Sequence, residues 1–199
     1  MGTQYKDDRP FTDYVHEHLA VPYIYAPLGW ATVTYDSNAD MNQGVDYSAK
    51  DATGRIVKIQ ERFRDNYYAD KYNDFTLRYR RDLNPDPSRH ASEFFKIEAD
   101  YLVYGITNGK KFADARHTLT GFLKYAVIDL AVLMAKIAEG KIIIPSAYKK
   151  FSELNANGIM TAAKMPNTDG SSDFVAFDVP MLVKLFATDK IVVAQKGFM

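Results

Sequence analysis

The sequence predicts an α/β protein in which short strands and short helices alternate along the chain. Several segments alternate apolar and polar side chains, as half-buried strands do, while others have the spacing and the N-terminal caps of helices. The chain has 199 residues, 47% of them hydrophobic, so it can bury a substantial core in one domain. The predicted helices are 11–19 and 92–97, and the predicted strands are 30–35, 44–47, 55–64, 74–81 and 99–106.

The most informative segment is a predicted hairpin, 44–64, with a Lys-Asp-Ala-Thr-Gly turn. Asp46 lies on its first strand, and Gln60 and Arg62 lie on its second. Side chains two residues apart on a strand share a face, so Gln60 and Arg62 project together, and Asp46 on the neighbouring strand could meet them. A carboxylate, an amide oxygen and a cation on one sheet face are suited to metal-assisted hydrolysis of a phosphodiester, although the same residues also occur on solvated hairpins.

This hairpin and its surroundings resemble the PD-(D/E)xK, or restriction endonuclease-like, nuclease superfamily. Asp46 corresponds to the family's Asp, and Gln60-x-Arg62 corresponds to its Asp/Glu/Gln-x-Lys. The predicted order of helix, three strands, helix and strand also matches. The resemblance implies a restriction endonuclease-like core with a mixed central sheet flanked by helices over 1–120, and an α/β extension over 121–199 packed on it as a single domain.

The resemblance also implies a function, a metal-dependent endonuclease that hydrolyses DNA with Mg²⁺ or Mn²⁺. Asp46 and Gln60 would be metal ligands, Arg62 would orient the attacking water or stabilise the phosphate, and Glu17 on the first helix would hold a metal-bound water. Two residues depart from the pattern, because Gln60 is neutral and the guanidinium of Arg62 cannot give up a proton. A nucleic-acid-binding protein without hydrolysis and a protein-interaction module are therefore the alternatives.

Glu61 leaves two interpretations open. If Gln60 and Arg62 face the site, Glu61 shares the opposite face with Val57, Ile59 and other apolar residues, where a carboxylate is costly unless it is paired. Either Glu61 has a basic partner on that face, or a bulge turns it toward Asp46 and makes it a metal ligand.

Basic residues after the hairpin are the predicted DNA-binding residues. Residues 1–50 contain three Lys or Arg and seven Asp or Glu, while 55–90 contain nine and six. We expect strand 74–81 to pair with strand 55–64 through the tyrosine-rich loop 66–73. Arginines interleaved with tyrosines suit phosphate contact and base stacking, although an arginine stripe can simply be solvated. The predicted DNA contacts are Arg64, Arg78, Arg80, Arg81 and Lys96, and the four histidines are predicted to lie on the surface.

The C-terminal half contains two similar segments, 129–144 and 178–193, which align without gaps 49 positions apart. Each follows a predicted strand and reads as an Asp N-cap, a short helix, a turn, a lysine and an aliphatic run. Asp129 and Asp178 are the predicted caps. We assign these units to packing, to the approach of DNA or to formation of a homodimer.

The composition and the missing motifs exclude several other classes of protein. The chain has no cysteine, which rules out disulfides, zinc–thiolate sites and thiol nucleophiles and makes the cytoplasm the expected setting. No apolar run reaches the length of a membrane span, and we expect no secretory signal. Motifs for nucleotide binding, serine hydrolysis or zinc proteolysis do not occur.

Overall fold

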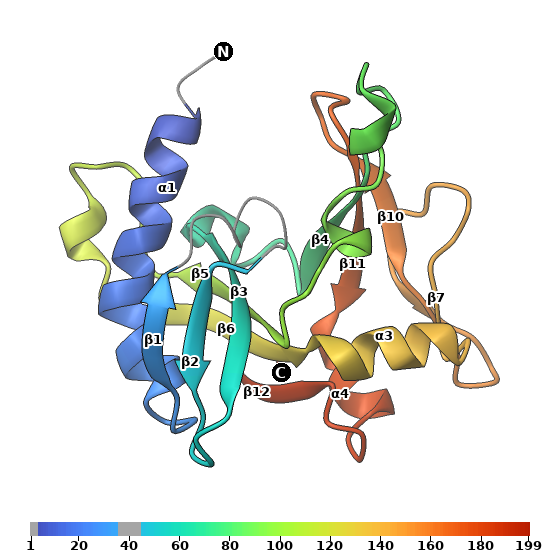
Figure 1. Ribbon diagram of the computed structural model, residues 1–199. Helices are drawn as coiled ribbons and strands as arrows, with labels where there is room; N and C mark the ends of the chain where they lie inside the picture. Colours follow the sequence, from blue (N-terminus) through green and yellow to red (C-terminus); the bar gives the residue numbers. More distant parts are fainter. Residues whose placement is uncertain (1–3, 36–44) are drawn as a thin grey trace.

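The computed structural model in Figure 1 describes residues 4–35 and 45–199. Its main element is a six-stranded sheet with the order β1-β2-β3-β5-β6-β12, in which β3 and β5 are parallel and all other neighbours are antiparallel. The predicted α/β class is confirmed, and β2 and β3 pair as the predicted hairpin, although its first residue, Gly44, lies outside the described residues. The strands are β1 (Ala31–Tyr35), β2 (Tyr47–Lys50), β3 (Ile56–Arg64), β5 (Tyr101–Thr107), β6 (Phe122–Asp129) and β12 (Val192–Lys196).

Two consecutive helices cover one face of this sheet. Helix α1 (Gln4–Val15) continues directly into a π-helix, η1 (His16–Tyr25), so the helical segment is longer than predicted. Its apolar side chains form one buried cluster with residues of β3, β5 and β6. Val15, Leu19, Ile24, Val57, Ile59, Val103 and Val127 belong to this cluster.

The other face packs against a second layer, on the right in Figure 1. A three-stranded sheet has the order β10-β11-β4, and two short helices pack into the same buried cluster, with Leu102, Phe75, Leu133 and Leu182 among its members. These elements are β4 (Asp74–Arg80), β10 (Ala163–Pro166), β11 (Asp173–Asp178), α3 (Leu130–Ala138) and α4 (Val179–Leu185). A small third sheet contains β7 (Ile142–Ile143), β8 (Glu153–Leu154) and β9 (Met160–Thr161). Single 3₁₀ turns are η2 (Asn66–Tyr68), η3 (Pro87–Arg89), η4 (Glu93–Phe95) and η5 (Arg116–Thr118).

The predicted pairing of strand 74–81 with strand 55–64 is wrong. Strand β4 pairs with β11, about a hundred residues further along the chain. The reason is that β2 and β5 occupy both edges of β3, so no backbone groups of β3 remain for β4. Strand β4 therefore crosses to the second layer.

The predicted helix 92–97 is also wrong, since the segment forms only the 3₁₀ turn η4. Phe94 and Phe95 both contact the ring of Tyr79, with centroids 5.2 and 5.0 Å away. The turn ends at Lys96, whose φ of −124° and ψ of 0° lie outside the α-helical range, so the helix does not continue.

The two similar C-terminal segments fold as their sequences predict. Asp129 accepts a hydrogen bond from the Val132 N–H at 2.9 Å, and Asp178 accepts one from the Met181 N–H at 2.8 Å, so each aspartate caps a helix. The chain then enters different sheets, because α3 leads to β7 and α4 leads to β12 at the edge of the main sheet. Among the described residues, no helix is long and apolar enough to cross a membrane.

Candidate functional site

Strand β3 carries polar side chains on both of its faces. Residues with odd numbers, Val57, Ile59 and Phe63, face helices α1 and η1, and Glu61 follows the same alternation. Gln60 and Arg62 face the second layer, where Arg62 reaches β4. The polar residues near Asp46 thus fall into two clusters separated by a single strand.

The helix-side cluster consists of His16, Tyr25, Tyr47 and Glu61. Oε1 of Glu61 accepts a hydrogen bond from the Tyr25 hydroxyl at 2.6 Å and lies 2.8 Å from Nδ1 of His16. The His16 ring stacks on Tyr47, with centroids 3.5 Å apart and ring planes within 3°. The Glu61 side chain has no solvent exposure, and its Oε2 has no hydrogen-bond partner among the described residues.

The π-helix brings His16 and Tyr25 to the same carboxylate. The two residues are nine apart, which is about two and a half turns of an α-helix and would place them on opposite faces. Hydrogen bonds from residue i to i+5 widen the turn to roughly four and a half residues, so nine residues make about two full turns. His16 is buried, and the prediction that it lies on the surface is wrong.

Glu61 has the basic partner that one of the two interpretations required. It also lies beside Asp46, whose Oδ2 accepts a hydrogen bond from the Glu61 backbone N–H at 2.6 Å. Burial, followed by the charge of Glu61, raises the pKa of Tyr25 and of Tyr47 well above the usual range of tyrosine, and Asp46 adds to both shifts. The Asp46 carboxylate therefore belongs electrostatically to the helix-side cluster.

The arginine-side cluster consists of Gln60, Arg62, Thr76, Arg78 and Glu93. The Glu93 carboxylate accepts hydrogen bonds from the Gln60 amide at 2.7 Å, from the Arg62 guanidinium at 2.5 Å and from the Arg78 backbone N–H at 3.1 Å. Arg62 also donates to the Thr76 carbonyl at 2.6 Å. Oε1 of Gln60 is buried, and within residues 4–35 and 45–199 it has no partner.

Positive charge is concentrated around this cluster. Burial lowers the pKa of Arg78, and the neighbouring charges of Arg81 and Arg62 lower it further, while Glu93 and Asp169 oppose that change. Arg78 is half-buried rather than fully solvated, so its strand is more than an exposed arginine stripe. The Glu93 carboxylate pairs with the Arg62 guanidinium, and its charge also acts on Arg78.

The other predicted site residues lie outside the two clusters. Glu17 lies on the surface, with its side chain 77% exposed and its carboxylate 3.9 Å from Nε2 of His18. Arg64 lies over the ring of Tyr68 at 5.3 Å. Arg80 pairs with Asp82 at 2.8 Å on the surface, Arg81 is half-buried, and Lys96 is exposed.

The structure brings Asp46 together with Glu61, but these acids do not form a complete metal cage. Among the described residues, no group of three or more histidine, cysteine, aspartate or glutamate side chains is arranged to hold a metal ion. Mg²⁺ usually keeps several waters and needs only one or two carboxylates, so two adjacent acids suit it in donor type.

The sequence interpretation missed two residues of the helix-side cluster, His16 and Tyr25. Glu93 was predicted as a secondary site residue that shares a helix face with Lys96, and the structure places it in the arginine-side cluster. The signal for a partner of Glu61 was present, because an acid on an apolar strand face requires one. The sequence did not identify that partner as His16, because a π-helix cannot be recognised from a 3.6-residue period.

No family model matches the chain, and the comparison with curated proteins finds no match.

Proposed function

We propose that this protein is a metal-dependent nuclease that hydrolyses phosphodiester bonds in DNA, with its metal beside Asp46 and Glu61. The observation that supports this most is a buried Glu61 carboxylate whose Oε2 lacks a partner within the described residues, on a residue whose backbone N–H donates to the carboxylate of a second acid, Asp46. An unpaired buried carboxylate oxygen is costly, and a cation compensates that cost. The resemblance of the Asp46 and Gln60-x-Arg62 pattern to nucleases points to the same chemistry.

The donors fit a hard divalent cation. Asp46 and Glu61 supply carboxylate oxygens, whereas the amide oxygen of Gln60, which has no partner among the described residues, lies on the opposite face of β3. We favour Glu61 over Gln60 as the second ligand, because Asp46 contacts the Glu61 backbone and acts on the tyrosines beside Glu61. A bound Mg²⁺ or Mn²⁺ supplies charge stabilisation and lowers the pKa of an attacking water.

The chain's own residues would position the substrate. Asp46 is partly exposed whereas the Glu61 side chain is fully buried, so a phosphate group approaches from the Asp46 side. His16 and Tyr25 fix one oxygen of Glu61 and leave the other available. Arg62 on β3 and Arg78 on β4 provide positive charge on the opposite, second-layer face of the main sheet, where Arg62 would exchange Glu93 for a DNA phosphate other than the one at the metal.

A second candidate is a nucleic-acid-binding protein that has lost hydrolysis. The observation that favours it is that Arg62, at the position of the nuclease lysine, is already neutralised by Glu93 and bonded to the Thr76 carbonyl. An Arg62→Lys variant distinguishes the two functions. A nuclease should keep or gain cleavage with a compact ammonium at this position, whereas a protein that only binds DNA should lose affinity and gain no strong cleavage.

The test of hydrolysis is nicking of supercoiled plasmid DNA in Mg²⁺ or Mn²⁺, with a chelator as the blank. Asp46→Asn and Glu61→Gln should each reduce the rate by about a hundredfold or more. Asp114→Asn, at an exposed acid, is the matched control and should cleave like wild type. Circular dichroism establishes that each variant is folded.

Metal binding followed by the paramagnetic signal of Mn²⁺ identifies the ligands. Loss of Mn²⁺ binding in Glu61→Gln, with little change in Gln60→Ala, supports Glu61. Stronger binding in Gln60→Glu together with unchanged binding in Glu61→Gln would assign the site to Gln60 instead. Full nicking activity in a folded Asp46→Asn protein would refute the proposed site altogether.

A further inference from the structure

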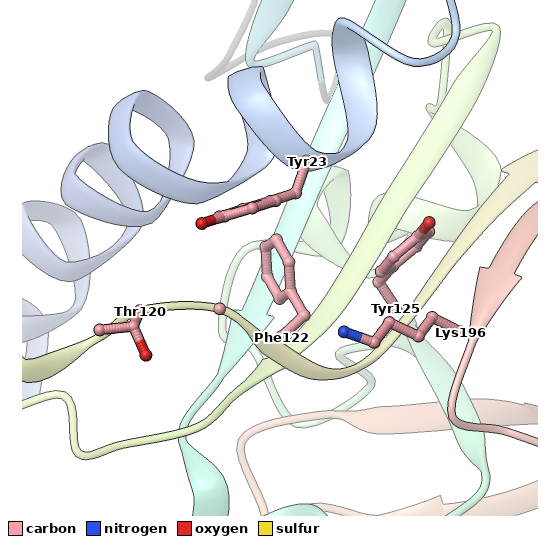
Figure 2. A pocket seen from close by; sticks show the side chains of 6 residues that line it. Tyr23, Thr120, Phe122, Tyr125 and Lys196 are labelled. Carbon is pink, nitrogen blue, oxygen red and sulfur yellow. The ribbon is translucent and has the colours of Figure 1, made fainter.

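A small pocket lies between η1 and the β6–β12 edge of the main sheet, as Figure 2 shows. It has a volume of about 210 Å³ and is lined by Tyr23, Thr120, Gly121, Phe122, Tyr125 and Lys196. None of these residues belongs to the helix-side or the arginine-side cluster. The pocket is smaller than the roughly 300–1,000 Å³ of drug-sized sites, so one planar ring system is the largest group that it can enclose.

Phe122, at the base of the pocket, is held in place before any ligand binds. Phe122 is buried and contacts the rings of Phe63 and Tyr125, with centroids 5.7 and 6.0 Å away. A methyl group built on Gly105 would lie only 2.5 Å from the Phe122 ring, so glycine at that position allows the ring to sit against the sheet. Tyr23 is 51% exposed and presents an accessible ring above Phe122.

The pocket combines these rings with a positive charge that no acid in its lining neutralises. Lys196 lies opposite Tyr125 in the pairing of β12 with β6, and its ammonium group points toward Phe122 in Figure 2. Within the part of the chain that the structure describes, Lys196 forms no ion pair or side-chain hydrogen bond. Aromatic rings beside a cation are suited to a stacked base with its phosphate.

We propose that this pocket binds an unpaired nucleotide of a single-stranded nucleic acid. A base would stack on the exposed ring of Tyr23, and Lys196 would contact the adjacent phosphate. A base inside a duplex cannot enter, since both of its faces are already stacked. The proposal does not depend on hydrolysis at Asp46, but it places a second nucleic-acid contact on η1, the helix that also carries His16 and Tyr25.

The test is the affinity of the full chain for a fluorescein-labelled oligothymidylate, an oligouridylate and a DNA duplex, measured by fluorescence anisotropy in a chelator. Tyr23→Ala should weaken binding of one or both single strands by roughly tenfold and leave the duplex unchanged. Lys196→Gln should reduce the slope of log affinity against log salt by about 0.7 for the single strand. The two single strands show whether DNA or RNA is preferred.

Two control variants match these changes in side-chain type. Tyr148→Ala removes another exposed tyrosine and Lys141→Gln another exposed lysine. Neither residue lines the pocket, so neither change should alter single-strand affinity. Unchanged binding in Tyr23→Ala and Lys196→Gln, or equal losses for single strand and duplex, would overturn the proposal. Cleavage in Mg²⁺ and single-strand affinity in a chelator are measured separately, so failure of the nuclease proposal and failure of this pocket are distinguishable results.

Discussion

Replacing Glu93 by glutamine separates a purely structural role of the arginine-side cluster from a role in binding phosphate. The Glu93 carboxylate accepts from Gln60, Arg62 and the Arg78 backbone. Glutamine keeps the shape and one acceptor oxygen but removes the charge, so at least one charge-assisted hydrogen bond, worth about 1.5–3 kcal/mol, is lost. The Arg62 side chain is 22% exposed, so water compensates part of its charge. We expect a loss of about 2 kcal/mol in the free energy of unfolding, less than the roughly 3–5 kcal/mol for a fully buried broken pair.

The same substitution should strengthen binding to DNA if Arg62 contacts phosphate. Removing Glu93's charge releases the guanidinium from its internal anion, so about one more phosphate is neutralised in the complex. The slope of log affinity against log salt should steepen by about 0.9 for a duplex. Fluorescence anisotropy across a salt series measures the slope, and urea denaturation measures the stability.

Glu98→Gln is the matched control, because it removes an equal charge from an exposed residue that pairs with Lys58 on the surface. It corrects for the change in net charge and should alter neither the stability nor the slope by much. If Glu93→Gln costs stability while its salt slope equals that of Glu98→Gln, then Glu93 and Arg62 form only a structural tie, and the phosphate role of Arg62 is refuted.

Two further predictions concern buried acids. Burial and the opposing Asp178 raise the pKa of Asp74 to about 6, above its ordinary 3.8. Between these two pKa values the folded state binds more protons than the unfolded state. The free energy of unfolding therefore falls as the pH rises from 3.8 to about 6. Asp74→Asn should therefore flatten the pH dependence of the stability measured by urea denaturation, and it should add up to about 3 kcal/mol to the free energy of unfolding at pH 8. Equal stabilisation at pH 3 and at pH 8 would contradict this prediction. Tyr25→Phe removes a hydrogen bond to Glu61, so we expect the free energy of unfolding to fall by about 1–2 kcal/mol and the Tm by about 3–6 °C. An unchanged Tm would show that this hydrogen bond makes no net contribution to stability.

Local signals in the sequence were sufficient for part of this structure. The caps at Asp129 and Asp178 depend only on residues within one helical turn, so their spacing predicts them. The hairpin of β2 and β3 likewise depends on a short turn and on alternation. The need of Glu61 for a basic partner also follows from the apolar residues that share its face.

Partners that are distant along the chain could not be predicted in the same way. Alternation in 74–80 indicates which side chains are buried but not which strand lies alongside, and β11 supplies that strand only after residue 172. Glu93 was expected to face Lys96 on a helix, whereas the 3₁₀ turn directs it to Arg62. His16 was predicted to lie on the surface, whereas it is buried at the start of the π-helix, which brings it and Tyr25 to the same carboxylate.

The pairing of β4 with β11 has a consequence for synthesis of the chain on the ribosome. When the first 120 residues have emerged, β4 has no partner strand, and β5 lacks its antiparallel neighbour β6. The face of β3 that carries Gln60 and Arg62 is then not covered by a complete second layer. Apolar residues such as Phe75 and Leu77 remain exposed to solvent at this stage. The nascent N-terminal segment is thus a candidate for chaperone binding, and expression of 1–120 alone should yield a protease-sensitive product.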